Sequence, residues 1–173
     1  MKIDYKRNFR KWVALLAAIV CYFIIHEGAH LIYALCVGAF KKVNFLALGV
    51  QVEVFSDKMS DIQLGWFCLV SAIATLTVGY ILAALTRRIT KVKSAYFRAI
   101  MYYITLCFLL IDPLYLSVLY SFVGGGDMNG IIFLIHELET RIIFGILAGV
   151  NVILIFKNII PQYKRAYMST TRL

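Results

Sequence analysis

The sequence predicts an all-α membrane protein with about four transmembrane helices and a small membrane-associated β-segment. Of the 173 residues, 62% are hydrophobic and only 16% are charged. In soluble domains, roughly a quarter of all residues are charged. The mean hydropathy is +0.82, and the apolar residues are concentrated in four long runs. A water-soluble globule of this length could not bury so much apolar surface. We therefore expect one polytopic, integral membrane domain over residues 1–173.

The basic residues predict how the chain is oriented in the membrane. The formal net charge is +9, and Lys and Arg gather before the first apolar run, between the second and third runs, and after the last one. The positive-inside rule then places both termini and the 87–98 loop in the cytoplasm, as four crossings require. Because the positive charge lies in short segments between apolar runs, it indicates contact with the lipid bilayer and no binding of nucleic acid.

The first apolar run predicts a helix over about 12–37, anchored at its cytoplasmic end by Trp12 and ended by Gly38. The segment 43–55 follows, and in its second half Val50, Val52 and Val54 alternate with other residues. Such alternation is typical of a β-strand. An unpaired strand cannot face lipid, so we expect a small hairpin or sheet at the outer interface, covered by protein.

The other three apolar runs predict helices over about 62–86, 99–123 and 131–157. Small residues in the first of these suit close packing of helices. Pro113 removes a backbone donor within the second and is expected to kink it. The glycine-rich stretch 124–130 predicts a flexible turn, and the tail from Pro161 onward is polar and expected to fray.

The motif His26-Glu27-Gly28-Ala29-His30 lies inside the first predicted helix. Two histidines four positions apart share one helix face, and this spacing suits two imidazoles on a single zinc ion. Glu27, beside the first histidine, is placed to act as a general base. Ionisable groups are expensive inside a membrane and usually have a function there, so the motif predicts a metal site.

A catalytic zinc site typically needs a third protein ligand, and two aspartates are candidates. Asp112 lies about half-way along the third predicted helix, which runs parallel to the first, so the two motifs reach similar depth. Asp127 follows three glycines, and a glycine-rich stretch can fold into a protein-lined cavity and present a carboxylate there. Without other information both remain open: Asp112 could also cap a kinked helix, and Asp127 could lie in an ordinary turn. His136 and Glu137 are further candidate ligands, but we expect them to lie near the membrane interface or to pair with Arg141.

These residues together resemble the site-2 protease family, the M50-type intramembrane zinc metalloproteases. The 26–30 motif is similar to the family's zinc helix, and the stretch from Ala34 through Gly49 is similar to its run into a membrane-associated β-segment. Asp112-Pro113 followed by Gly126-Asp127 is similar to its Asn-Pro segment followed by an aspartate ligand. The resemblance implies that Asp127 is the third ligand and that Asp112 takes the place of the asparagine near the substrate or metal.

The chain also departs from the family pattern. Asp127 is not in a Leu-Asp-Gly sequence, its separation from Asp112 is longer than is typical, and Asp112 stands where an asparagine is usual, so Asp112 stays an alternative third ligand. The second predicted helix carries Ser71-Ala72-Ile73-Ala74-Thr75 in place of a Gly-Pro motif. A compact chain without PDZ or CBS domains indicates a prokaryotic plasma membrane.

We therefore expect an intramembrane zinc metalloendopeptidase that hydrolyses a peptide bond of a membrane-protein substrate. In this interpretation Glu27 is catalytic and His26, His30 and Asp127 hold zinc, while Asp112 supports a ligand or replaces Asp127. Two alternatives belong to other classes. One is a non-catalytic membrane protein of the same fold that binds metal or a partner, and the other is a metal-ion transporter, for which the intramembrane acids are few.

Overall fold

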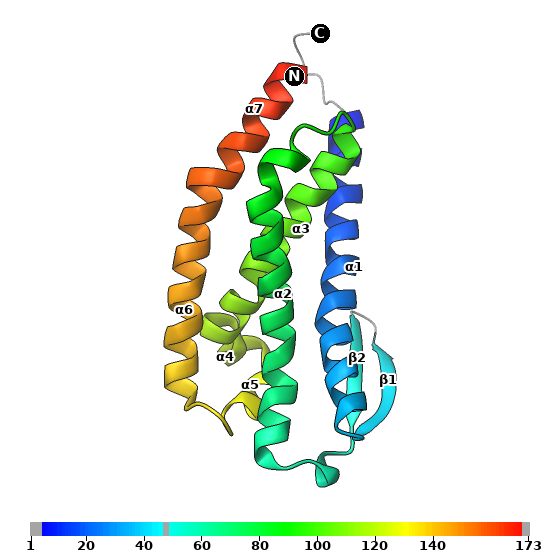
Figure 1. The fold of residues 1–173 in the computed structure, drawn as a ribbon, viewed down its shortest axis with the longest axis vertical. Helices are drawn as coiled ribbons and strands as arrows, with labels where there is room; N and C mark the ends of the chain where they lie inside the picture. Colours follow the sequence, from blue (N-terminus) through cyan, green and yellow to red (C-terminus); the bar gives the residue numbers. More distant parts are fainter. Residues whose placement is uncertain (1–4, 47–48, 171–173) are drawn as a thin grey trace.

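The computed structural model describes residues 5–46 and 49–170 and confirms the predicted fold class. Four long helical stretches run side by side along the molecule, and a two-stranded hairpin lies beside one of them (Figure 1). Within the described residues, the four stretches that are long and apolar enough to cross a membrane are Asn8–Cys36, Asp61–Ile89, Ala95–Val123 and Glu137–Met168. The protein is thus an all-α membrane protein with a small β-segment.

The long helices have somewhat different bounds from those expected at 12–37, 62–86, 99–123 and 131–157. Helix α1 spans Tyr5–Cys36, α2 spans Asp61–Ile89 and α3 spans Ala95–Leu114. The last stretch consists of α6 (Glu137–Leu154), a π-helical segment (Ile155–Ile159) and α7 (Ile160–Thr170). The expectation that the tail frays from Pro161 is wrong over the described residues. Tyr163 of α7 packs against Ile89, Leu109 and Ile159, so tertiary contacts stabilise this polar helix.

At the expected segment 43–55 the structure has an antiparallel pair of strands, β1 (Phe40–Leu46) and β2 (Gly49–Val54), while residues 47–48 lie outside the described residues. Gly38 adopts a φ of +70°, which few other residues tolerate, and thereby turns the chain from α1 into β1. The hairpin lies alongside the second half of α1 (Figure 1), and Val52 is buried against the protein. Lys41 on β1 donates a hydrogen bond of 2.5 Å to Glu53 on β2, and this contact lowers the pKa of Glu53 to about 2.

The backbone donor that Pro113 lacks is compensated by polar groups from two other helices. Proline cannot donate to the carbonyl four residues earlier, which leaves the Leu109 oxygen without its helical partner. The Asn151 side chain of α6 donates to this oxygen at 2.7 Å, and the Tyr80 hydroxyl of α2 donates to the Asn151 amide oxygen at 2.7 Å. Beyond the proline the chain continues as a π-helical segment (Tyr115–Leu119) and α4 (Tyr120–Val123). One buried asparagine therefore joins α2, α3 and α6.

Replacement of Asn151 by leucine should destabilise the protein by about 1–2 kcal/mol, because the Leu109 carbonyl and the Tyr80 hydroxyl lose their partner in an apolar interior. The midpoint of SDS-induced unfolding in mixed micelles measures this effect. Asn158→Leu is the matched control, since Asn158 is exposed and the same change there should leave the midpoint in place. Equal midpoints for the two variants would show that the asparagine bridge does not stabilise the fold.

The glycine-rich stretch 124–130 is only partly a turn. Gly124 and Gly125 have φ values of +69° and +155°, so they provide a sharp reversal that other residues would resist. The chain then enters a short helix, α5 (Gly126–Ile131), where a flexible turn was expected. A Cβ atom at Gly130 would lie 3.1 Å from the Leu64 carbonyl oxygen of α2, so the glycine permits close approach of α5 to α2. Because Met128 and Ile131 are fully buried, tertiary packing orders this helix.

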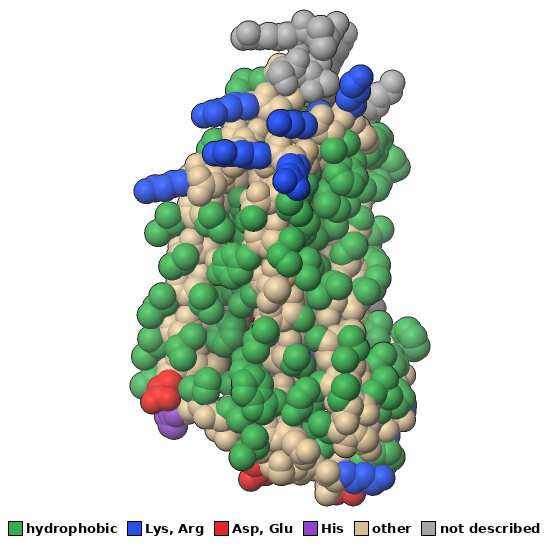
Figure 2. All heavy atoms as spheres, viewed as in Figure 1, with side chains coloured by type: hydrophobic (Ala, Val, Ile, Leu, Met, Phe, Trp, Pro, Cys, Tyr) green, Lys and Arg blue, Asp and Glu red, His purple; other side chains and the backbone are tan. Residues whose placement is uncertain are grey.

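Charged side chains are divided between the two ends of the molecule. Lys and Arg cluster at the end where α1 begins and α7 ends, and the visible acidic side chains lie at the opposite end (Figure 2). At that opposite end His136 caps α6 by accepting a hydrogen bond from the Leu138 amide, and Glu137 pairs with Arg141 at 3.3 Å. The pairing of Glu137 with Arg141 agrees with the prediction. On the face shown in Figure 2, the side chains between the two ends are mainly hydrophobic.

Candidate metal centre

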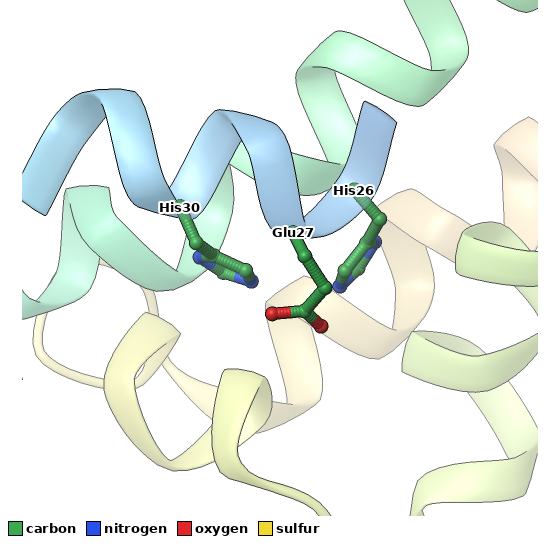
Figure 3. A group of neighbouring side chains, drawn as sticks. All are labelled: His26, Glu27 and His30. Atoms are coloured by element: carbon green, nitrogen blue, oxygen red, sulfur yellow. The ribbon is translucent and has the colours of Figure 1, made fainter. Parts of the chain in front are cut away.

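The H-E-x-x-H motif forms one turn of α1 and points into the molecule. His26 and His30 lie one helical turn apart, and their side chains and that of Glu27 project to the same side of the helix (Figure 3). The residues His26 and His30 are 8% and 4% exposed, so they do not face the surrounding lipid. One potential ligand atom from each of the three residues lies within 4.8 Å of the others. The predicted geometry of the motif is therefore present.

Asp127 of α5 lies opposite the two histidines. One carboxylate oxygen is 3.3 Å from Nε2 of His26, and the other is 3.4 Å from Nε2 of His30. These separations are longer than a typical N–H···O hydrogen bond of about 2.9–3.0 Å. They match the distance between two ligands of one tetrahedral zinc ion, which is about 3.3–3.4 Å for metal–ligand bonds of about 2.0–2.1 Å. The two contacts use different oxygens of Asp127, so the carboxylate spans both Nε2 atoms, and two imidazoles with one carboxylate are a donor set that suits zinc.

The other ring nitrogen of each histidine is engaged on the side away from Asp127. Nδ1 of His30 lies 2.7 Å from the carbonyl oxygen of Phe67 on α2. Because a carbonyl only accepts, this contact assigns the proton to Nδ1 and leaves the Nε2 lone pair for a metal. Metal-binding histidines are commonly oriented in this way.

His26 is oriented by a second polar group, formed by Tyr22 and Asp112. Nδ1 of His26 lies 3.1 Å from the Tyr22 hydroxyl and 3.3 Å from an Asp112 carboxylate oxygen. The tyrosine donates its own proton to that carboxylate oxygen at 2.6 Å, so its oxygen is available to accept from Nδ1–H of His26. This arrangement also leaves the Nε2 lone pair of His26 directed toward Asp127.

The structure places the two candidate aspartates on opposite sides of His26. Asp112 is 1% exposed, and its second oxygen accepts a hydrogen bond from the Thr75 hydroxyl. Both of its oxygens are thus used behind the imidazole, away from Nε2. Asp127, in contrast, lies beside the Nε2 atoms of both histidines. The geometry therefore favours Asp127 as the third ligand and gives Asp112 the part of orienting His26.

Glu27 is held by the hairpin. One carboxylate oxygen accepts a hydrogen bond of 2.9 Å from the backbone amide of Val52 on β2. This amide points away from β1, so the edge of β2 that β1 leaves uncovered faces the site. A cavity of about 660 Å³ is lined by β2, by the motif and by Asp127. Glu27 thus lies between a candidate metal centre and an accessible strand edge.

A second cavity reaches the same residues from another side. It measures about 550 Å³ and lies between α1 and the stretch from α3 to α4. His26, Glu27 and Asp127 line both cavities. The second is bordered mainly by apolar side chains, among them Phe23, Leu114 and Leu119. The site can accordingly be approached past the polar strand edge and past an apolar wall.

Sequence reasoning missed three polar partners of the site. Tyr22 precedes His26 by four residues and so shares its helix face, a spacing that could have identified it. Thr75 was named only within the stretch that stands in place of a Gly-Pro motif, and its hydroxyl contact to Asp112 joins residues 37 positions apart. The Phe67 carbonyl is a backbone group, for which side-chain identity gives no signal.

Comparison of this chain with protein-family models, with curated proteins and with solved structures finds no match. The interpretation of the site therefore depends on its own geometry and chemistry.

Proposed function

We propose that this protein is an intramembrane zinc metalloendopeptidase that hydrolyses a peptide bond of a membrane-embedded substrate. The observation that carries the proposal is that the Asp127 carboxylate lies within 3.4 Å of Nε2 of both His26 and His30, with Glu27 beside the two histidines. Three protein ligands leave a fourth position of a tetrahedral ion for water or substrate, which is the arrangement of a catalytic zinc site. The resemblance of the motif residues to site-2 proteases supports the same activity.

In this proposal the chain's own groups orient the reactants and move the proton. A bound zinc ion would polarise the scissile carbonyl and make water acidic enough to lose a proton near neutral pH. Glu27 accepts the proton from the attacking water and passes it to the leaving nitrogen. The backbone amide of Val52 holds the Glu27 carboxylate between these transfers. Tyr22, Asp112 and the Phe67 carbonyl keep the imidazoles directed at the metal.

The hairpin provides a place for the substrate. A peptide bond inside a helix is shielded because its carbonyl is hydrogen-bonded, so the substrate must unwind locally before it is cut. The open edge of β2 offers backbone groups with which an extended segment can pair. Residues 49–54 line the cavity that also holds Glu27, so a paired substrate would pass beside the catalytic carboxylate.

The proposed orientation follows from the charge distribution. The basic end of the bundle, where α1 begins and α7 ends, is assigned to the cytoplasm. His26 is the twenty-second of the 32 residues of α1, so the metal centre lies nearer the outer face. The membrane is proposed to be a prokaryotic plasma membrane, with a membrane protein as substrate and no nucleic acid as partner.

Metal removal tests the proposed activity. Purified protein in proteoliposomes should cleave a single-span membrane protein that carries helix-destabilising Gly and Pro residues near its outer end. Treatment with a zinc chelator should abolish cleavage, and stoichiometric zinc should restore it, as followed by gel mobility and mass spectrometry of the products. Cleavage that persists at full rate in zinc-free protein would disprove a metalloprotease.

A second candidate is a closed, structural metal site in a non-catalytic protein. The observation in its favour is that a Glu27 oxygen lies within 4.8 Å of the candidate ligand atoms of both histidines. Glu27 could then serve as a fourth protein ligand, and a structural zinc site has four. The zinc content of a Glu27→Gln variant distinguishes the two functions, because a structural site would lose metal and a catalytic site would keep it.

A further inference from the structure

A cavity of about 590 Å³ lies at the basic end of the bundle, far from the metal centre. It is enclosed by the first part of α1, the start of α3 and the end of α7. Four cationic side chains from these three helices line it, namely Arg10, Lys11, Arg98 and Lys164. Because the four come from segments distant in sequence, the fold itself concentrates positive charge here.

Two of the cations are held in place by one aromatic ring. The guanidinium carbon of Arg10 lies 5.5 Å from the centre of the Tyr167 ring, and that of Arg98 lies 5.2 Å from it. Both distances are within the range of cation–π attraction. Arg98 is 4% exposed, and it donates to the Val92 carbonyl at 2.7 Å. These contacts reduce the conformational freedom of both side chains, so the cavity is preorganised for a ligand.

The rest of the wall is apolar or aromatic. Ala95, Ala99 and Met168 line it together with Tyr102 and Tyr103, and among the described residues no carboxylate does so. A site of this kind suits a molecule with an anionic head and an apolar body. Guanidinium groups are well matched to phosphate oxygens because they present several donors in one plane.

We propose that this cavity binds the phosphate headgroup of an anionic phospholipid from the adjacent leaflet. Basic pockets between transmembrane helices are suited to such headgroups. Arg10 and Arg98 contact the phosphate, Lys11 and Lys164 add positive charge at the entrance, and the start of the acyl chains lies against Met168 and the tyrosines. This inference is independent of the proposed protease activity.

A second basic cavity at the same end provides an internal control. It measures about 600 Å³ and is lined by Arg87, Lys91, Lys157 and Arg165, and among the residues that the structure describes no aromatic side chain lines it. It has the same number of cationic side chains as the first cavity. Within the described part of the chain it lacks a counterpart of the Tyr167 ring, and its apolar wall is less extensive. If only net charge mattered, both cavities would attract anionic lipid equally.

Native mass spectrometry of the full chain, released from detergent after titration with phosphatidylglycerol or phosphatidylcholine, tests the proposal. We expect one tightly bound phosphatidylglycerol and at least about tenfold weaker binding of phosphatidylcholine. The Arg10→Gln/Lys164→Gln variant should weaken phosphatidylglycerol binding by about tenfold or more, because it removes two nearby charges. The Arg87→Gln/Lys157→Gln variant, which loses the same charge, should bind as the wild type does.

Two further measurements distinguish loss of the binding site from a failure to fold, and a lipid phosphate from inorganic phosphate. The charge-preserving Arg10→Lys/Lys164→Arg variant should retain most of the binding if charge and cavity, and not overall stability, are responsible. Equal losses in the two glutamine variants would overturn the proposal in favour of diffuse attraction. Displacement of the lipid by millimolar inorganic phosphate would overturn it in favour of a soluble anion.

Discussion

Replacement of Glu27 by glutamine should abolish peptide cleavage while leaving the zinc content at one ion per chain. Glutamine has the same shape and can still accept the hydrogen bond from the Val52 amide, but it cannot take a proton from water. General base catalysis contributes typically 10²–10⁴-fold, and we expect a loss of at least this size. Initial cleavage rates in proteoliposomes and zinc measured by atomic emission on the same preparations check both parts of the prediction.

The matched control is Glu139→Gln, at an exposed position near the start of α6. It makes the same chemical change at the end of the bundle nearer the candidate metal centre and should alter neither rate nor metal content. A Glu27→Gln protein that cleaves normally would remove the glutamate from the mechanism. If Glu27→Gln lost its zinc instead, the glutamate would be a ligand, and the closed structural site would become the better interpretation.

Most of the fold could be predicted from the sequence because its helices and strands follow from local, repeating patterns of apolar residues. Stretches of about 20 predominantly apolar residues predict membrane-spanning helices, and the alternation of Val50, Val52 and Val54 predicts a strand. The boundaries were less accurate. Helix α7 was expected to fray because its own residues are polar, yet Tyr163 anchors it to the bundle. Such contacts join distant segments and have no local signal.

The residues of the site also fall into those with a local sequence signal and those that depend on tertiary packing. His26, Glu27 and His30 could be found because their spacing is fixed by one turn of a single helix. The choice between Asp112 and Asp127 could not be made from residue types, since both are carboxylates near the right depth. It depends on how α3 and α5 pack against α1. In the structure the two aspartates contact different nitrogen atoms of the His26 imidazole. Asp112 lies beside Nδ1 and Asp127 lies beside Nε2.

This separation leads to the second prediction, which concerns zinc affinity. Asp127→Ala removes a carboxylate that lies beside both Nε2 atoms, so the purified variant should retain no stoichiometric zinc after dialysis. Asp112→Asn keeps an oxygen for the Tyr22 hydroxyl but weakens the orientation of His26. Loss of such a supporting contact typically costs about 10–100-fold in metal affinity. Competition with a fluorescent zinc chelator measures both variants on one scale.

Which of the two variants loses more zinc affinity shows which aspartate is the third ligand. Zinc retained by Asp127→Ala and lost by Asp112→Asn would make Asp112 the third ligand and contradict the geometry described above. Asp57→Ala controls for the loss of a carboxylate, because Asp57 is exposed in the short 3-10 helix Ser56–Lys58 before α2 and its substitution should leave zinc affinity unchanged. Far-UV circular dichroism separates loss of metal from loss of fold. Met128 and Ile131 remain to hold α5 against the core when Asp127 becomes alanine, so the helical signal should persist while the zinc is gone.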